Sequence, residues 1–394
     1  MYINTYLILI FLCNYVYSET FLQILKKYNY PAEEHVIETS DGYILKAQRI
    51  PHGADGTQPR EVVLLGHGMG GSGENFILLG PPDGLAYYLS DRGFDVWFFN
   101  ARGSLHSRKH KSLSPDRNRK QFWNFSWHEI ATIDLVDTVN YILRVTGKDG
   151  LFYVGHSQGT TILMVMLAEH PEMNQKVKAA TLLAPSAYLQ HTSSPILSLG
   201  SKLRRLGESI TSMLNMYELP MSNGLILNRF LKTLCNRSSM KDICMDAVYL
   251  LGGANSGLVN KTLLPMLIEF IPSSISTKQA WHYGQVIASG EFKQYDYGKK
   301  MNQKKYNSPT PPMYNMSNIE VPIGLFYGDS DPFSTPKMID EFVKVLPNIE
   351  LVYKAPEENF NHLDYILAYN AKEIINDVLL DKVFKKYMDD NTVD

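Results

Sequence analysis

The sequence has few of the features typical of nucleic-acid-binding, metal-binding or membrane-spanning proteins. Its 38 basic and 40 acidic residues leave a formal net charge of −2, and no long block of lysine or arginine marks a surface for phosphates. No cluster of histidine, cysteine and aspartate has the spacing of a metal site. After residue 18, no apolar run is long enough to span about 30 Å of hydrocarbon. We therefore expect no nucleic-acid partner, no metal and no cofactor.

Residues 1–18 contain no lysine or arginine but carry an apolar run from Tyr6 to Leu12. A short apolar run followed by small residues predicts a secretory signal peptide that is removed from the mature chain. A membrane anchor is the alternative, and the run is short for that role. We expect the mature protein to be made in an oxidising compartment.

The chain has only three cysteines, and Cys13 lies in the predicted signal peptide. Cys235 and Cys244 remain as a pair that can close a small loop, so we expect a disulfide there, with two buried thiols as the alternative. The same compartment would make glycosylation sites of the Asn-x-Ser/Thr sequons at Asn124, Asn236, Asn260 and Asn315.

A serine between two glycines organises the rest of the chain. An apolar run from Leu151 ends in Gly155-His156-Ser157-Gln158-Gly159, and a predicted helix then continues to His170, before Pro171. This pattern is typical of a nucleophile elbow, in which a strained strand-to-helix turn exposes the serine hydroxyl. The glycines would let the backbone pass without Cβ clashes. The amide of Gln158 would face developing negative charge at the helix N-terminus.

A glycine-rich loop, Gly66-His67-Gly68-Met69-Gly70-Gly71, follows a buried-type strand at 62–65. It lacks the Gly-Lys-Ser/Thr ending of a phosphate loop, which argues against nucleotide binding. After an early strand, such a loop can instead supply half of an oxyanion hole through a backbone amide. We expect the donor to be the N–H of Met69, and His67 to orient the loop.

Strands and helices alternate along most of the chain, which predicts a mostly parallel sheet with helices on both faces. A hairpin is expected at 34–50, strands at 95–99 and 179–183, and a helix at 127–145. From 186 to 312 the alternation gives way to helical patterns, so this stretch predicts an inserted helical cap over the carboxyl ends of the strands. Residues 19–185 and 313–394 would form the core.

An aspartate and a histidine follow the last two predicted core strands. Asp331 comes after the strand at 321–327, and His362 after the strand at 349–353. The order Ser, Asp, His is the one expected of an α/β-hydrolase. We expect Ser157 as nucleophile, His362 as general base and Asp331 as its partner, with Asp329 as the competing acid. His156 is assigned to packing.

The sequence resembles the acid lipase family of gastric and lysosomal lipases, with the related insect lipases. The resemblance covers nearly the whole mature chain, and its motifs lie at 30–34, 41–45, 95–103, 122–129, 155–160, 281–282 and 361–364. It implies an α/β-hydrolase core with a helical cap and lid, the same triad and oxyanion residues, and the same cysteine pair. It also implies a secreted or lysosomal protein. Asn124 and Thr335 stand where the family usually has aspartate.

The leading hypothesis is a serine lipase that hydrolyses triacylglycerols or steryl esters at an emulsion or membrane interface. A carboxylesterase of soluble esters is the alternative within the same class of enzyme. A lipid carrier that keeps the pocket without the reaction is the alternative outside it, although Ser157, Asp331 and His362 argue against a silent site.

Overall fold

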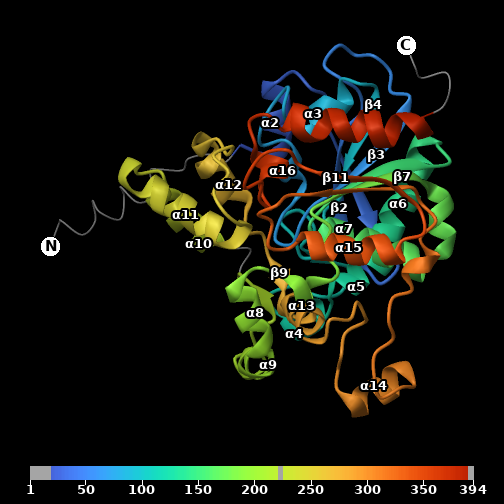
Figure 1. Cartoon of the computed structure of the whole chain (residues 1–394), viewed down its shortest axis with the longest axis vertical. Helices are drawn as coiled ribbons and strands as arrows, with labels where there is room; N and C mark the ends of the chain where they lie inside the picture. The colour runs from blue at the N-terminus through green and yellow to red at the C-terminus, as the bar shows by residue number, and fades with distance from the viewer. Residues whose placement is uncertain (1–18, 221–224, 389–394) are drawn as a thin grey trace.

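The computed structural model describes residues 19–220 and 225–388 (Figure 1). The predicted signal peptide therefore lies outside the described residues. A nine-stranded sheet forms the centre of the described part. Its strands are β1 (Glu33–Glu38), β2 (Tyr43–Ile50), β3 (Glu61–Gly66), β4 (Phe94–Phe98), β5 (Lys109–His110), β6 (Leu151–His156), β7 (Val177–Leu183), β10 (Ile323–Tyr327) and β11 (Ile349–Lys354).

The strand order is β1-β2-β4-β3-β6-β7-β10-β11, with β5 paired to β2. From β4 to β11 every neighbouring pair is parallel, whereas β1, β2 and β5 are antiparallel additions at one edge. The predicted hairpin is confirmed as β1 and β2, and the predicted mostly parallel α/β sheet is confirmed.

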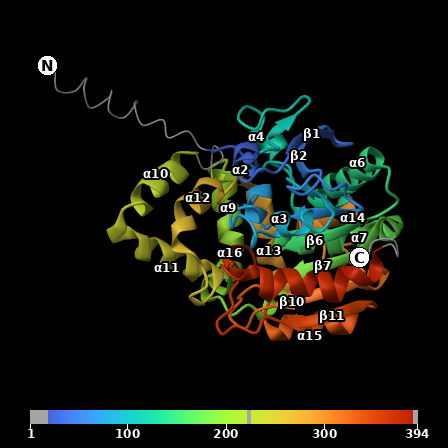
Figure 2. The ribbon, with the colours of Figure 1, turned by 90° about the horizontal axis from the view of Figure 1, so that it is seen from above.

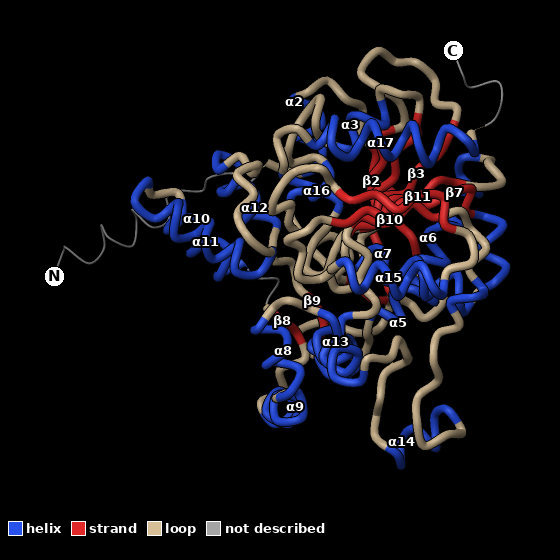
Figure 3. The backbone as a smooth tube through the Cα atoms, in the orientation of Figure 1, coloured by secondary structure: helices blue, strands red, loops and turns tan. Residues whose placement is uncertain are grey.

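Both faces of the sheet are covered by helices. Figure 3 shows α3 (Leu85–Ser90) and α17 (Asp377–Leu379) on one face, and α7 (Gln158–Glu169) and α15 (Pro336–Val345) on the other. Successive residues of β3 enter different cores because side chains alternate across a strand. Val62 and Leu64 pack in the core under α7, whereas Val63 and Leu65 pack in the core under α3. A strand buried on both faces needs apolar residues at consecutive positions, which explains the apolar runs in the sequence.

The helices of the core follow the strands in the predicted alternation. They are α2 (Phe21–Lys27), η1 (Gly73–Phe76), α3 (Leu85–Ser90), α4 (Arg119–Phe122), α5 (Trp127–Glu129), η2 (Ile130–Leu135), α6 (Val136–Thr146), α7 (Gln158–Glu169), η3 (Pro171–Lys176), η8 (Met316–Asn318), α15 (Pro336–Val345), α16 (Asp364–Leu367), η9 (Lys372–Asn376), α17 (Asp377–Leu379), η10 (Leu380–Phe384) and η11 (Lys385–Tyr387). The helix predicted at 127–145 is present as the consecutive elements α5, η2 and α6.

Residues 186–312, which we call the helical insertion, join β7 to the last part of the core. Figures 1 and 2 both place its helices α10 and α11 at one side of the sheet. Its elements are η4 (Leu189–His191), α8 (Pro195–Lys202), α9 (Arg204–Met213), β8 (Glu218–Leu219), α10 (Leu225–Cys235), η6 (Ser238–Met240), α11 (Lys241–Gly252), η7 (Lys261–Leu263), α12 (Leu264–Phe270), β9 (Ile275–Ser276), α13 (Thr277–Ser289) and α14 (Lys299–Tyr306). The boundaries of core and cap stay predictions. In the described part of the chain, no helix is long and apolar enough to cross a membrane.

A buried ion cluster fixes the loop that follows β4. Arg102 and Asp134 are almost fully buried, and the Arg102 side chain donates to Asp134 at 2.8 Å and to Asp41 at 2.6 and 2.9 Å. The guanidinium also lies 3.9 Å from the centre of the Tyr43 ring. Burial raises the pKa of Asp134, and the neighbouring guanidinium opposes that shift. The cluster therefore joins the hairpin turn, the β4 loop and the η2 helix.

Replacing Arg102 by alanine should lower the free energy of unfolding by about 3 to 5 kcal/mol, because Asp134 would stay buried without a cationic partner. Urea unfolding at pH 7 measures this difference. Arg117→Ala is the matched control because Arg117 is exposed, and its effect should stay within about 0.5 kcal/mol. Equal effects of the two substitutions would contradict the importance of the cluster.

Candidate active site

Ser157 occupies a sharp turn between β6 and α7, with φ 55° and ψ −118°. This conformation is unfavourable for a residue with a side chain and persists only where the surroundings impose it. The amide of Ser157 donates to the Leu183 carbonyl at 3.0 Å, and the Ser157 carbonyl accepts from the Thr160 amide at 2.9 Å. Hydrogen bonds on both sides of the turn therefore hold the hydroxyl at the carboxyl ends of the parallel strands.

The glycines of the motif are required by close backbone contacts. A Cβ on Gly159 would lie 2.1 Å from the Gly66 carbonyl oxygen, and a Cβ on Gly155 would lie 2.7 Å from the carbonyl carbon of Gly159. Helix α7 can therefore approach β3 and β6 only because both positions lack a side chain.

The structure brings Ser157, His362 and Asp331 into one hydrogen-bonded row. His362 Nε2 lies 2.8 Å from Ser157 Oγ, and His362 Nδ1 lies 3.0 Å from both carboxylate oxygens of Asp331. Asp331 also accepts from the Phe333 amide at 2.8 Å, which orients the carboxylate. Asp331 and His362 are both buried. This geometry can remove a proton from the hydroxyl and stabilise the resulting imidazolium.

The competing acid, Asp329, lies elsewhere. Its nearest ionic partner in the described residues is Lys354, with 3.6 Å between Oδ2 and Nζ. The structure therefore pairs His362 with Asp331, and Asp329 takes no part in the row.

Two backbone amides are free beside the serine. Within the described residues, neither Met69 N–H nor Gln158 N–H donates a hydrogen bond. Gln158 opens α7, where the helix dipole favours negative charge. The loop that carries Met69 runs close to the serine, since a Cβ on Gly68 would lie 3.1 Å from Ser157 Cβ. The two amides are the donors that an oxyanion would need.

Two buried histidines support the site without entering the triad. His67 Nδ1 lies 2.7 Å from the Gly68 carbonyl, and its Nε2 accepts from the Ala101 amide at 3.2 Å, so it fixes the glycine-rich loop. His156 Nε2 lies 2.8 Å from the carbonyl oxygen of His362. Burial lowers the pKa of His67 to about 4 and that of His156 to about 3, so both rings are neutral at physiological pH.

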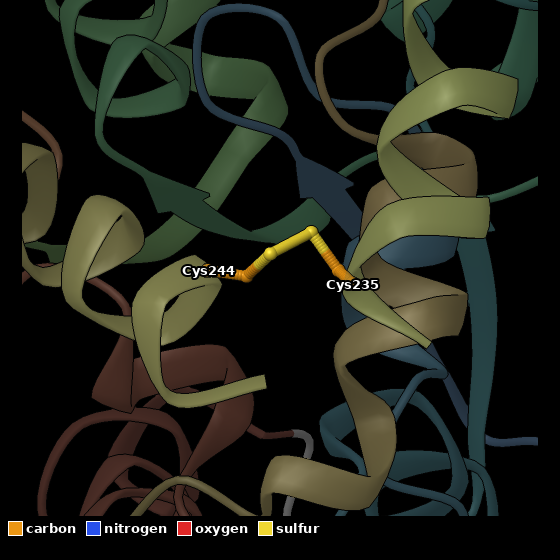
Figure 4. The surroundings of a disulfide bond; sticks show 2 residues. All are labelled: Cys235 and Cys244. Atoms are coloured by element: carbon orange, nitrogen blue, oxygen red, sulfur yellow. A yellow bond between two sulfur atoms is a disulfide. The ribbon is translucent and has the colours of Figure 1, made fainter. Parts of the chain in front are cut away.

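The structure also places the remaining candidate residues. Figure 4 shows the disulfide between Cys235, at the end of α10, and Cys244 in α11, so the expected pair forms and the alternative of two thiols is wrong.

The sequon asparagines are all exposed: Asn124, Asn236, Asn260 and Asn315. Thr335 donates to the His191 carbonyl at 3.3 Å. Among the described residues, no group of three histidine, cysteine or acidic side chains is arranged to hold a metal ion.

Comparison with known proteins identifies the family. The family described as alpha/beta hydrolase fold matches residues 61–217, and the partial alpha/beta-hydrolase lipase region matches residues 21–80. Gastric triacylglycerol lipase of Bos taurus is 35% identical over 91% of this chain and 89% of its own length. Human lipase member K is 34% identical over the same shares of the two chains. The chain belongs to the acid lipase family.

Two further comparisons agree with this family membership. Lipase 1 of Drosophila melanogaster is 35% identical over 90% of this chain and 77% of its own length. A solved structure from Sulfolobus solfataricus, at 17% identity, covers 89% of this chain and 93% of its own with a TM-score of 0.58. That likeness supports the α/β-hydrolase fold alone.

In this acid lipase, the hydrogen-bond partners of the His362 backbone could not be predicted from the sequence. His156 was assigned to packing, yet it also contacts the His362 carbonyl. The motif at 361–364 includes Asp364 but gives it no role, and nothing in the sequence marks Gly252, whose carbonyl accepts from the His362 amide at 2.9 Å. The only available signal was the position of Asp364 three residues after Asn361, which is typical of a local carboxylate-to-amide bond.

The strain at the elbow can be measured with two inactive variants. Ser157→Gly should unfold at a higher temperature than Ser157→Ala, with a difference in unfolding free energy of about 1 kcal/mol, because glycine adopts positive φ freely. Calorimetry on both variants measures this difference. Because both substitutions remove the hydroxyl, its loss cancels in the comparison. A glycine variant less stable than the alanine variant would contradict strain at this turn.

Proposed function

We propose that this chain is a serine lipase that hydrolyses carboxylic esters of lipids, either triacylglycerols or steryl esters. The observation that carries the proposal is the unbroken row from Asp331 through His362 to Ser157, beside the free amides of Met69 and Gln158. The relatives named above include a triacylglycerol lipase, which favours a lipid ester over other acyl substrates.

In the proposed mechanism, Ser157 Oγ attacks the ester carbonyl carbon while His362 Nε2 accepts the hydroxyl proton. The carbonyl oxygen becomes an oxyanion that accepts hydrogen bonds from the amides of Met69 and Gln158, which lowers the barrier by several kcal/mol. The intermediate expels the alcohol, to which His362 returns the proton. His362 then removes a proton from water as the water oxygen adds to the acyl carbonyl carbon. The second intermediate breaks its bond to Ser157 Oγ, to which His362 returns the proton, and releases the fatty acid. Asp331 holds the imidazole tautomer throughout.

An apolar surface on the helical insertion supports a lipid interface as the place of action. Seven large apolar side chains of α8, α9 and their ends are between 45% and 81% exposed: Ile196, Leu199, Leu203, Leu206, Ile210, Met213 and Leu214. Within each helix they recur at intervals of three or four residues, which gathers them on one face. Single exposed apolar residues are ordinary on a protein surface, but a set on one face marks a binding surface. We call this set the apolar face of α8 and α9.

The opposite side of α9 packs against α13. A Cβ on Gly207 would lie 2.3 Å from the Trp281 ring, and the Trp281 indole donates to Thr211 Oγ1 at 3.1 Å. Lys202 and Arg205 are exposed beside the apolar face, whereas Glu208, the acidic residue of α9, is half-buried beside Gln285. An apolar face with basic flanks suits a lipid surface that carries anionic headgroups or fatty acids.

The proposed route to that surface is the secretory pathway, which leads outside the cell or to a lysosome. The disulfide and the exposed sequon asparagines support this route, and the predicted signal peptide at 1–18 would begin it. We propose that the cap comprises residues 186–312 and that the four sequons carry glycans.

Purified mature protein should release fatty acid from emulsified triacylglycerol or cholesteryl ester, and Ser157→Ala should reduce the release by at least about 10³-fold. Titration of fatty acid at pH 5 and pH 8 measures both rates. Folding of the variant is checked by its circular dichroism spectrum.

Hydrolysis of soluble esters with no preference for the emulsions would favour the carboxylesterase alternative. A folded protein that releases no acid and fails to react with a fluorophosphonate probe would favour the lipid carrier.

Replacing Leu206 and Ile210 together by serine should weaken binding to lipid emulsions about tenfold, because less apolar surface leaves water. The rate on a dissolved short-chain ester should stay unchanged. The matched control is Val343→Ser with Val352→Ser, which removes side chains of similar exposure from α15 and β11. Flotation with vesicles that contain anionic lipid measures binding, and equal losses in the two double variants would contradict a docking role for this face.

A further inference from the structure

The helical insertion contacts the catalytic histidine through one short segment. Residues 252–259, which we call the crossing segment, connect α11 to η7 and lie against the loop that carries His362. The His362 amide donates to the Gly252 carbonyl at 2.9 Å. Because His156 contacts the His362 carbonyl from the core, the peptide groups on the two sides of His362 are each held by a hydrogen bond.

Further hydrogen bonds continue along the crossing segment. The Asn361 side-chain amide donates to the Ala254 carbonyl at 2.9 Å, and the Tyr369 amide donates to the Leu258 carbonyl at 3.1 Å. The insertion is therefore joined to the histidine loop on both sides of His362.

The crossing segment also reaches the loop that carries the catalytic acid. The Ala254 amide donates to Ser330 Oγ at 3.3 Å, one residue before Asp331. Gly253 has φ +115°, and a Cβ there would lie 2.2 Å from the Ser330 carbonyl oxygen. Only glycine permits this approach, so the segment is fitted closely against both loops.

Asp364 joins the crossing segment to the histidine loop. The side chain is fully buried, its Oδ2 accepts from the Asn361 amide at 2.7 Å, and its Oδ1 accepts from Ser256 Oγ at 2.9 Å. The carboxylate thus closes a short turn around His362 and ties that turn to the insertion. The triad itself makes no use of this group.

We propose that Asp364 is a positioning residue for His362, acting with Ser256 and the crossing segment, so that the helical insertion helps to set the geometry of the triad. The inference rests on the serine mechanism proposed above. It assigns a catalytic effect to residues that touch neither the substrate nor the imidazole ring.

The electrostatic surroundings of Asp364 give a readout beyond stability. Burial raises the pKa of Asp364 to about 6, against the opposing hydrogen bonds from Asn361 and Ser256, and the charge of Asp331 adds to the rise. The other titratable groups that face it are Tyr249 of α11 and Tyr365, and burial raises the pKa of each phenol, so both stay neutral. Asp364 is thus ionised above about pH 6 and neutral below it.

Ionisation of Asp364 weakens the folded state, because its folded pKa lies above the ordinary value of 3.8. Stability associated with this group is greatest at low pH and is lost as the pH rises from about 4 through 6. Asparagine in its place can still accept from the Asn361 amide without a buried charge. Asp364→Asn should therefore unfold at a temperature no lower than wild type at pH 7.5.

The test compares Ser256→Ala, Asp364→Ala and Asp364→Asn with wild type on a soluble ester, with labelling of Ser157 by a fluorophosphonate alongside. Ser256→Ala should lower kcat about threefold to tenfold with KM unchanged, since one hydrogen bond is lost. Asp364→Ala should lower kcat on the order of a hundredfold, the effect of a displaced catalytic group. Asp364→Asn should recover most of that loss, and labelling rates should follow kcat.

The pH dependence separates positioning from simple structural support. The ratio of wild-type kcat to Asp364→Asn kcat should fall towards one as the pH is lowered from 7.5 to 5, because protonation makes Asp364 neutral, like the asparagine of the variant. Any pH dependence that the two proteins share cancels in this ratio. The control is Ser276→Ala, which removes a different contact between insertion and core, the hydrogen bond to the Phe125 carbonyl. It should lower the unfolding temperature and leave kcat unchanged.

Wild-type kcat and labelling rates in both Ser256→Ala and Asp364→Ala would overturn the positioning role while leaving the serine mechanism intact. If Asp364→Ala does not fold, an unchanged kcat in Ser256→Ala overturns the role by itself. A wild-type protein that neither hydrolyses esters nor reacts with the probe would instead overturn the proposed function, so the two failures are distinguishable.

Discussion

The close approach of helix α7 to the sheet is the constraint on which the rest of the site depends. Gly159 lies against the carbonyl of Gly66, at a distance that excludes any side chain. At the turn before this contact Ser157 has φ 55°, and Gln158 opens helix α7 directly after it. The close approach also places the end of β3 beside the serine, so the glycine-rich loop starts at the site. The same packing contact thus lies beside the turn of Ser157 and the start of the glycine-rich loop, the two segments that the proposed mechanism uses.

The features that could be predicted from the sequence are those that short-range patterns encode. The Gly-x-Ser-x-Gly spacing, the apolar runs of the buried strands and the acid after β10 each reflect a local requirement of backbone or burial. The contacts around Gly252 could not be predicted, because they join residues at least 76 positions apart, and a glycine or serine in the sequence does not show which distant loop it meets. The partner of His156 could not be predicted either, because it is the backbone carbonyl of His362, and every residue carries such an acceptor.

The helical insertion meets the core on two sides of the site. On the histidine side the crossing segment contacts the loops of Asp331 and His362. On the side of the glycine-rich loop, the Ser273 amide donates to the Gly70 carbonyl at 2.7 Å. The Ser273 hydroxyl also accepts from the Leu105 amide at 2.8 Å. The disulfide ties α10 to α11, the helix that leads into the crossing segment. A displacement of α11 would therefore be transmitted to the histidine loop through the backbone, without any contact to substrate.

Burial keeps two histidines of the site, His67 and His156, in the neutral form. His67 and His156 have pKa values of about 4 and 3, so neither places a positive charge beside the oxyanion loop or beneath His362 at neutral or mildly acidic pH. In the proposed mechanism, the imidazolium of His362 would therefore face the Asp331 carboxylate without a second charge on His67 or His156. The same burial weakens the fold in acid, because the unfolded chain protonates these rings near pH 6.5 while the folded chain resists. The free energy of unfolding that each ring contributes is present above about pH 6.5 and declines as the pH falls towards the folded pKa of that ring. Keeping His67 and His156 neutral therefore makes the folded state less stable in acid.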